Sequence, residues 1–240
     1  MFRAATKGRN LLLENAGLVG GNEVFQDQET GSRWQQSSQQ AISGPLKGER
    51  LELYPFLLTD WAEWQRLHPD TLVLKPLPGY AERIPEKNEQ IRQGLSGEGS
   101  APAGVLRVDD RLKPKTMIVG LAVGGSDEAF PLSALRQERV INHELGGQPV
   151  VIVHQPSSDT TTVFLASAKG TRLKFTAANA DATELIDEQT KSHWSPYGEC
   201  ISGALKGSKL KPLILEPEYW FAWSEFHPDT KIYGATETKR

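Results

Sequence analysis

The sequence predicts an α+β fold that is mostly β, made of two tandem copies of one antiparallel β-rich domain. Three observations predict it: an internal repeat, short apolar runs rich in branched residues, and a short tryptophan-rich helix in each copy. Runs of this kind, bounded by turn residues, are typical of strands. We expect strands at residues 11–13, 72–74, 117–119, 150–153 and 213–215.

The repeat is long and ordered. Residues 41–71 align with residues 200–230 at a fixed offset of 159, without a gap, and 13 of the 31 aligned positions are identical. Upstream, the pattern Asp-x-x-Thr-x-Ser-x-Trp occurs at residues 27–34 and again at 187–194. Self-similarity of this length indicates a duplicated structural unit.

The two copies differ in extent, which predicts the domain boundaries. We assign residues 1–82 to a truncated first repeat, 83–103 to a linker and 104–240 to a complete second repeat. The equivalent of residues 104–162 would precede Met1 in the first copy, so we expect Met1 to be an internal start or the edge of a fragment. The linker is rich in Gly, Pro, Ser, Glu and Lys and has almost no apolar pattern.

Each copy is predicted to contain one aromatic helix. In the first copy Asp60 is the candidate N-cap, with Glu63 three residues later as in a capping box. In the second copy we expect Pro217 in the first turn. A proline after the final histidine of each helix should end it, because the residue before proline avoids the α region. A third short helix is expected from Pro131 to Val140.

Two Gly-Gly pairs predict tight turns. They occur at residues 124–125 and 146–147, between apolar runs. Glycine is favoured in such turns because it adopts positive φ without steric cost.

Composition excludes several classes of protein. A net charge of -3 gives no basic field for nucleic acid or anionic lipid. The single cysteine, Cys200, excludes an internal disulfide and any multi-cysteine metal site. No apolar stretch reaches the roughly 18 residues of a membrane span, and the first residues lack the apolar core of a signal peptide.

The motifs resemble a bacterial and archaeal family, the domain of unknown function 3179. The resemblance rests on the Asp-x-x-Thr-x-Ser-x-Trp turn, the Gly-x-Leu-x-Gly segment and the Trp-x-x-Trp-x-x-x-His-Pro-Asp-Thr block, and continues through residues 129–132 and 146–151. It covers most of both copies. Members of the family are often exported, which implies a periplasmic or extracellular location for the full-length protein.

The resemblance also implies a metal or thiol site that this chain has altered. Many relatives carry Cys-Pro-x-Cys-Gly-Thr after the Pro-Val-Val strand, and a histidine in the preceding helix. Here the aligned segment runs from Gln155 to Thr160 without a thiol, and the histidine position holds Glu138. Without a thiolate the strand has neither a soft metal ligand nor a redox couple.

A divalent metal site remains a candidate beside the altered segment. His154, Glu138 and Asp159, with Glu144 or His143 nearby, offer imidazole and carboxylate ligands suited to zinc or copper. The alternative is that these polar residues solvate the end of a strand.

The tryptophan face of each helix has two interpretations as well. A ligand groove would be lined by aromatic and histidine side chains, and an Asp two residues after each histidine would orient its imidazole for acid–base work. The structural alternative is that the indoles are core and the histidines end the helices. The residues are Trp34, Trp61, Trp64, His68, Trp194, Trp220, Trp223 and His227.

Cys200 aligns with Ala41, which indicates a small packing residue. As a nucleophile it would need a nearby base, and His193 is the sequence-local candidate.

Two functional hypotheses follow. The first is a β-rich binding or scaffold module without its own catalytic site, with a protein or small molecule as its partner. The second is a metal-dependent or redox enzyme whose site needs the missing part of the first repeat. The loss of thiols at Gln155 and Ser158 favours the first.

Overall fold

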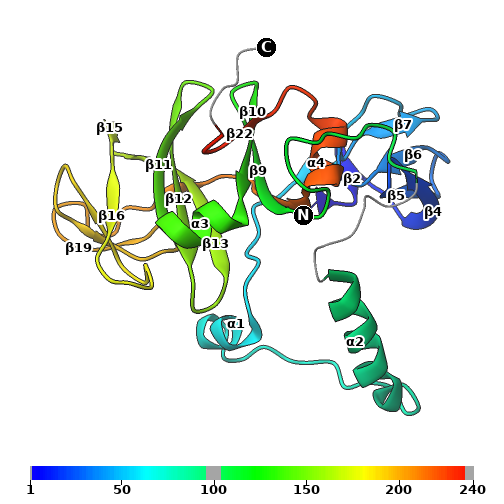
Figure 1. The fold of residues 1–240 in the computed structure, drawn as a ribbon, viewed down its shortest axis with the longest axis horizontal. Coiled ribbons are helices and arrows are strands. Elements are labelled where there is room, and N and C mark those ends of the chain that lie inside the picture. The colour runs from blue at the N-terminus through cyan, green and yellow to red at the C-terminus, as the bar shows by residue number, and fades with distance from the viewer. Residues whose placement is uncertain (1, 96–103, 236–240) are drawn as a thin grey trace.

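The computed structural model describes residues 2–95 and 104–235, and its architecture is the predicted α+β fold dominated by antiparallel sheets. We call residues 2–82 the first half and residues 104–235 the second half. Figure 1 shows the main sheets of the two halves toward opposite ends of the molecule, with α4 of the second half beside the sheet of the first.

The first half has one four-stranded antiparallel sheet, flanked by two short strand pairs and followed by a helix. The sheet order is β4 (Leu13–Val19), β5 (Asn22–Asp27), β6 (Arg33–Gln35) and β7 (Ala41–Ser43). The pairs are β1 (Phe2–Arg3) with β8 (Glu52–Leu53), and β2 (Ala5–Thr6) with β3 (Arg9–Asn10). The helix is α1 (Trp61–Leu67).

The second half has three four-stranded sheets. The outer sheet contains β16 (Phe175–Ala177), β17 (Leu185–Asp187), β18 (His193–Trp194) and β19 (Cys200–Ser202). The central sheet contains β11 (Val140–Leu145), β12 (Gln148–Gln155), β13 (Thr160–Leu165) and β20 (Lys211–Pro212). The inner sheet contains β21 (Glu216–Tyr219), β9 (Met117–Val123), β10 (Ser126–Pro131) and β22 (Lys231–Ile232).

The remaining elements of the second half are short. β14 (Ser167–Ala168) pairs with β15 (Thr171–Arg172), α3 (Leu132–Glu138) follows β10, and α4 (Trp220–Phe226) follows β21. The pairing of β10 with β22 is parallel, whereas the other named strand pairs are antiparallel. No helix within the described ranges is both long and apolar enough to cross a membrane.

Strand β12 of the central sheet is buried on both faces, which explains its uninterrupted apolar run. Alternate residues of a strand point to opposite faces. Val151 and Val153 of β12 face the core shared with the outer sheet, and Val150 and Ile152 face the core shared with β9, β10 and α3. A run of branched residues without polar alternation is what such a strand requires.

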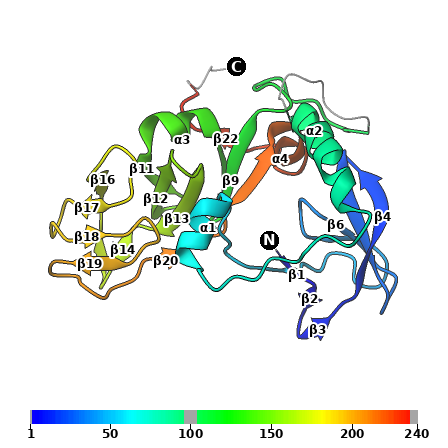
Figure 2. The ribbon, with the colours of Figure 1, turned by 90° about the horizontal axis from the view of Figure 1, so that it is seen from below.

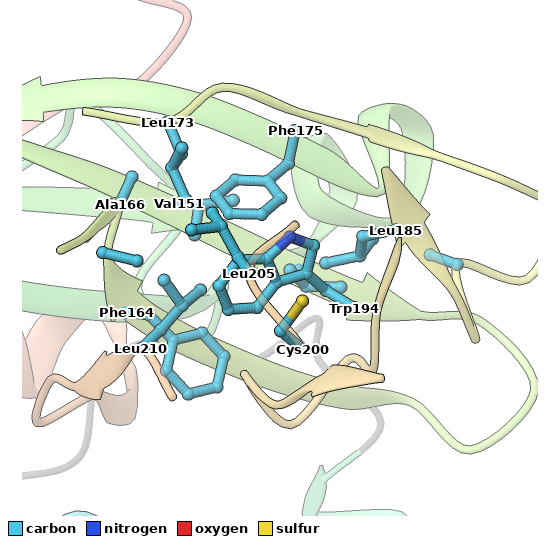
Figure 3. Packing of buried hydrophobic residues seen from close by; sticks show 13 residues of the cluster. Val151, Phe164, Ala166, Leu173, Phe175, Leu185, Trp194, Cys200, Leu205 and Leu210 are labelled. Atoms are coloured by element: carbon cyan, nitrogen blue, oxygen red, sulfur yellow. The ribbon is translucent and has the colours of Figure 1, made fainter. Parts of the chain in front are cut away.

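The outer core is organised around one tryptophan. The indole of Trp194 is fully buried and lies among apolar side chains that include Phe164 of the central sheet and Leu205 of the loop after β19 (Figure 3). Phe175 packs edge-on against it, with ring centroids 5.7 Å apart.

The Asp-x-x-Thr-x-Ser-x-Trp turn forms the same hydrogen bonds in both halves. Asp187 accepts from the backbone N–H of Thr190 at 2.6 Å and from Nε1 of Trp194 at 2.9 Å. Ser192 accepts from the backbone N–H of Leu205 at 3.1 Å, across the neighbouring loop. The first-half residues make the matching bonds at 2.6, 2.8 and 3.0 Å; they are Asp27, Thr30, Ser32, Trp34 and Leu46. The two halves thus share the contacts of this motif, and the duplication remains a prediction from the sequence.

The two halves contact each other reciprocally. Ser37 of the first half donates to Glu218 at 2.9 Å, just before α4. In the opposite direction, Tyr197 of the second half donates to Glu63 of α1, and Thr59 bonds Thr160 at 2.7 Å. Figure 2 shows α1 beside β13 and β20, and α4 toward the sheet of the first half. α1 is therefore held by the second half, and β21, the strand that leads into α4, is held by the first half.

The predicted helices form where local signals placed them, with one exception. Asp60 caps α1 by accepting from the backbone N–H of Glu63 at 2.7 Å. Pro217, expected in the first turn of α4, lies instead in β21, and Tyr219 is the N-cap. The proline pairs with Val119 of β9, so the strand extends almost to the helix.

Two predicted strands are wrong, and of the strand predicted at residues 11–13 only Leu13 lies in a strand, as the first residue of β4. Residues 72–74 belong to no strand, and Leu72 and Leu74 are almost fully exposed. Residues 213–215 lie between β20 and β21 rather than in a strand, although Leu213 donates its backbone N–H to Val163 at 2.9 Å. Apolar composition predicted strands in both places, but a strand also needs a neighbour to pair with.

The segment predicted as a linker contains helical structure. After η1 (Ala81–Arg83), α2 (Ile84–Leu95) covers much of the polar stretch before residue 96. Figure 1 shows α2 standing apart from the sheets. Its sequence is rich in Glu, Lys, Gln and Arg, which have good helix propensity, and this outweighs the weak apolar pattern. Residues 96–103 lie outside the described ranges.

Both Gly-Gly pairs form two-residue hairpin turns. All four glycines have positive φ, as a type I′ turn requires. The two turns also touch: a Cβ on Gly146 would stand 2.1 Å from the carbonyl oxygen of Val123, whereas one on Gly147 would meet nothing within 4 Å.

We therefore expect Gly146→Ala to lower the free energy of unfolding by about 3 kcal/mol, because it adds a backbone clash to left-handed strain. Gly147→Ala is the matched control and should cost about 1 kcal/mol, from strain alone. Urea unfolding followed by circular dichroism measures both. Equal losses would contradict the close contact of the two turns.

Candidate functional site

The candidate site surrounds the turn between β12 and β13. β12 ends at Gln155 and β13 begins at Thr160, so the altered segment of the sequence forms the hairpin connection. Asp159 closes this turn with φ of 50°, a left-handed conformation that Asp tolerates better than most residues. The end of α3 and the start of α1 lie beside it.

A buried histidine faces a carboxylate at this turn. His154 is fully buried, and its Nδ1 lies 3.0 Å from the hydroxyl of Thr161. Its Nε2 lies 3.4 Å from Asp159 Oδ1, and no hydrogen-bond partner is found for it in the described part of the chain. Burial lowers the pKa of His154, so the imidazole is neutral near pH 7.

Asp159 is held by an arginine of α3. Arg136 donates Nε to Asp159 Oδ1 at 2.9 Å and Nη2 to Oδ2 at 2.7 Å. These bonds from Arg136 hold the pKa of Asp159 below its ordinary value. Oδ1 of Asp159 therefore lies close to both the guanidinium of Arg136 and the imidazole of His154.

The other predicted metal ligands are engaged elsewhere. Glu138 accepts a hydrogen bond from the hydroxyl of Tyr233 at 2.9 Å. His143 pairs with Glu128 at 2.9 Å, and Glu144 pairs with Arg172. In residues 2–95 and 104–235, no group of three or more His, Cys, Asp or Glu side chains is arranged to hold a metal ion. Of the three predicted ligands His154, Asp159 and Glu138, the structure brings His154 and Asp159 together.

A cavity of about 470 Å³ opens beside this turn. Its walls are mostly apolar and come from β9, α3 and β21, with Leu58 from the segment before α1. Three polar side chains also line it: Arg136, Asp159 and Thr161. The cavity is thus a mostly apolar space whose wall includes the Arg136–Asp159 ion pair.

The tryptophans do not line this cavity. Trp34, Trp194, Trp220 and Trp223 are fully buried, as the core interpretation of their spacing requires. Trp61 is half exposed and Trp64 is partly buried.

Each helix histidine packs against the tryptophan one turn earlier, stacked in the second half and tilted in the first. The ring of His227 lies 3.7 Å from that of Trp223, and the ring of His68 lies 4.2 Å from that of Trp64. The carboxylate that bonds His227 is Asp127 of β10, at 2.8 Å, rather than the Asp of the His-Pro-Asp-Thr block.

The threonine of the same block has a structural role in both halves. Trp64 Nε1 donates to Thr71 at 3.0 Å, and Trp223 Nε1 donates to Thr230 at 2.9 Å. The His-Pro-Asp-Thr block therefore stabilises the end of each helix, which favours its structural interpretation.

Cys200 is a packing residue in this arrangement. It is buried, and its thiol donates to the carbonyl of Ser202 at 3.3 Å. Burial raises the pKa of Cys200, which makes the reactive thiolate scarcer. His193 pairs with Glu184 instead of the thiol.

A family model described as "Protein of unknown function (DUF3179)" matches residues 1–230. The chain belongs to this family. No curated protein and no solved structure matches it.

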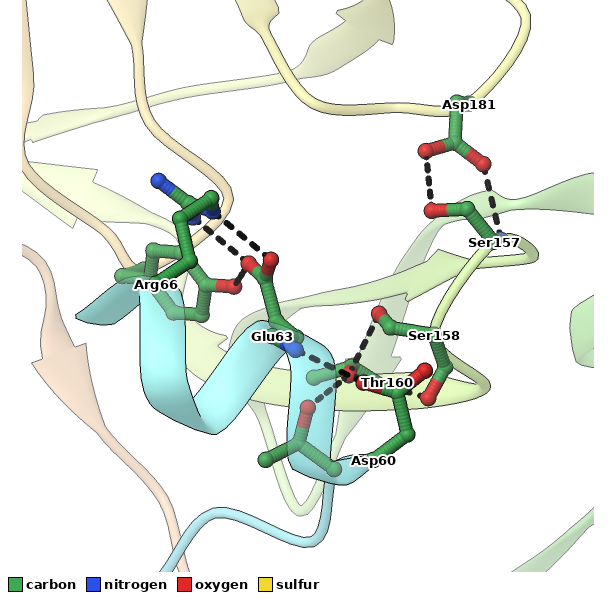
Figure 4. Close-up of polar contacts among 9 residues, drawn as sticks. Asp60, Glu63, Arg66, Ser157, Ser158, Thr160 and Asp181 are labelled. Carbon is green, nitrogen blue, oxygen red and sulfur yellow. Dashed lines mark hydrogen bonds and ion pairs between the residues drawn. The ribbon is translucent and has the colours of Figure 1, made fainter. Parts of the chain in front are cut away.

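In this DUF3179 chain the altered segment anchors α1 by hydroxyl groups. Ser158, which occupies the position of the second thiol in the resemblance, bonds Thr160 at 2.7 Å, and Thr160 bonds Thr59 at 2.7 Å (Figure 4). Ser157 donates its backbone N–H to Asp181 at 2.9 Å, on the other side of the turn.

One helical turn further along, the carboxylate of Glu63 holds α1 to the second half. Glu63 accepts from Tyr197 and from both Nε and Nη2 of Arg66 (Figure 4). The hydrogen bonds from Arg66 lower the pKa of Glu63 to about 2, so the carboxylate is charged at neutral pH.

Two partly buried glutamates form a second polar cluster that the sequence did not indicate. Pro217 and Tyr219 of β21 line the cavity, whereas Glu216 and Glu218 alternate with them and meet the first half. Burial raises the pKa of both carboxyls, and the nearby charge of Glu216 helps to raise that of Glu218 to about 8. Nothing in the local sequence Glu-Pro-Glu-Tyr distinguishes these glutamates from surface ones.

This cluster predicts that the free energy of unfolding depends on pH. Because the pKa of Glu218 rises from its ordinary value of 4.5 to about 8 on folding, the folded state binds this proton more tightly than the unfolded state. The resulting stability is fully present below about pH 4.5 and is lost as the pH rises through 8. Glu218→Gln mimics the protonated carboxyl and should reduce the fall in unfolding free energy between pH 5 and about pH 9.

Urea midpoints at several pH values across that range test this expectation. Glu188→Gln, at an exposed carboxyl, is the control and should leave the pH dependence of the wild type unchanged. Parallel curves for the wild type and Glu218→Gln would contradict the burial of a protonated Glu218.

Proposed function

We propose that this DUF3179 chain is a non-catalytic binding module, and that the cavity between β9, α3 and β21 is its ligand site. The observation that carries the proposal is a mostly apolar cavity of about 470 Å³ whose wall includes the Arg136–Asp159 pair. Small-molecule sites are commonly of this size and combine apolar walls with a few polar groups that fix orientation.

The walls define the chemistry of the ligand. Leu58, Leu132 and Tyr219 contribute apolar or aromatic surface, which favours a compact apolar body. Among the polar lining groups, the charges of Arg136 and Asp159 offset each other, and Thr161 adds a hydroxyl. A ligand with an apolar body and one hydrogen-bonding end group fits this arrangement.

The groups around the cavity act in binding and not in chemistry. His154, the imidazole beside the site, is fully buried and neutral, and it contacts Thr161 and Asp159. A general base must reach the proton it removes, which a buried ring behind the polar wall does not. Arg136 and Asp159 are engaged with each other, so they orient a ligand without transferring protons.

Filling the cavity should abolish binding. Leu132→Trp adds a large ring to the wall, and we expect it to remove the binding of an apolar solvatochromic dye that carries one sulfonate. The background should contain Leu72→Ser and Leu74→Ser, which remove a separate exposed apolar segment. Fluorescence titration measures the dye affinity and stoichiometry.

The matched control is Leu18→Trp, at an exposed leucine of β4. It should leave one dye site per chain. Equal dye binding by the Leu132→Trp and Leu18→Trp proteins would contradict the cavity as the ligand site.

A metal-dependent function is the second candidate. It is favoured by the unpaired Nε2 of His154, 3.4 Å from Asp159 Oδ1, because imidazole and carboxylate are both zinc ligands. A third ligand would come from the bound molecule or from another polypeptide.

Elemental analysis after exposure to zinc, copper and iron salts separates the two candidates. On the binding-module proposal, the protein retains less than one metal ion per chain, and His154→Ala changes nothing. His193→Ala, at a partly exposed histidine, is the control for nonspecific binding. Stoichiometric metal that is lost in His154→Ala but kept in His193→Ala would favour the metal-dependent function.

A further inference from the structure

The two tryptophan helices have the same internal contacts but very different surroundings. α4 buries Trp220, Ala222 and Trp223, whereas α1 has no buried residue. Trp220 is 0 % exposed and its counterpart Trp61 is 50 % exposed. The apolar segment 72–74 after α1 is exposed as well.

The cover over α4 is the β9–β10 hairpin with the segment that precedes it. Gly120 of β9 packs so closely that a Cβ there would stand 2.3 Å from the ring of Trp223. Arg111 lies over the ring of Trp220 at 5.1 Å, and Asp127 of β10 bonds His227 at 2.8 Å. Trp220, Trp223 and His227 of this face thus each contact a residue of the cover.

The hairpin also pairs with the strand that follows α4. β10 runs parallel to β22, with Glu128 opposite Lys231 and Ala129 opposite Ile232. At the offset of 159 residues, these two β22 positions correspond to Leu72 and Val73. Within the described residues of the first half, no strand pairs with that segment.

The α1 face already has the geometry that α4 uses. Trp64 donates to Thr71 at 3.0 Å as Trp223 does to Thr230 at 2.9 Å, and the ring of His68 packs, tilted, against that of Trp64. Glu63 and Thr59 hold the opposite side of α1 to the second half. The exposed face is therefore fixed in position without its cover.

We propose that α1 and residues 71–74 form a docking surface for a β-hairpin of the β9–β10 type, supplied by another polypeptide. The hairpin carries a glycine that packs on Trp64, an arginine over Trp61 and an acidic residue that bonds His68. Its second strand runs parallel to residues 72–73 and pairs with them. Strand addition gives affinity by main-chain hydrogen bonds, and the side-chain contacts give specificity.

A synthetic peptide of residues 109–131, which contains Arg111, Gly120 and Asp127, is the probe for this surface. We expect it to bind the full chain at one site, measured by fluorescence anisotropy of the labelled peptide. The Gly120→Val peptide should bind at least about tenfold more weakly, because the added side chain collides with the indole. On the protein, Trp61→Glu and Val73→Lys should have a similar effect, with unchanged circular dichroism.

Leu18→Lys, at an exposed leucine of β4, is the matched control and should bind the peptide as the wild type does. Equal binding of the unsubstituted peptide and the Gly120→Val peptide would overturn the proposal. So would a chain that dimerises alone and becomes monomeric in Val73→Lys, because a second copy would then cover the face. Analytical ultracentrifugation distinguishes that result from a monomer that binds one peptide.

Discussion

Both halves of the structure depend on a carboxylate placed beneath a tryptophan. Asp27 and Asp187 are fully buried, and burial alone would raise the pKa of each carboxyl. Hydrogen bonds from the indole and from the turn threonine lower it instead, so the charge is retained and satisfied. Removing such a partner would leave an uncompensated buried charge, which is among the most costly changes a core can suffer.

The same turn ties distant segments of each half together. Ser192 accepts from Leu205, and Gly203 lies so close to Ser192 that a Cβ would stand 2.7 Å from its Cα. Gly44 meets Ser32 in the same way at 2.6 Å. The Gly-x-Leu-x-Gly segment is thus required by the turn, and the two motifs that recur together in the sequence are parts of one contact.

Local chemistry made much of the fold predictable. Asp60 as N-cap, the proline after His68 and the Gly-Gly turns act within a few residues, so a single sequence contains the information. Contacts between distant segments were not predictable in this way. The pairing of Arg136 with Asp159, the burial of Glu218 and the exposure of residues 72–74 depend on which elements meet across the molecule.

The residues of the candidate site were likewise predictable only in part. The family resemblance identified the turn after β12 as altered, and His154 and Asp159 do meet there. Glu138 was grouped with them because it occupies the position of the family's helical histidine, but its carboxylate bonds Tyr233, 95 positions away. The cavity was not foreseeable, because its walls come from β9, α3, β21 and Leu58 together.

The seating of α1 on the second half has a consequence for synthesis on the ribosome. Glu63 of α1 bonds Tyr197, 134 residues further along the chain. At translation rates of about 5–20 residues per second, α1 would wait on the order of ten seconds for the surface that holds it. Until then Glu63 and Thr59 lack their partners, so α1 takes its final position only after most of the second half has been synthesised.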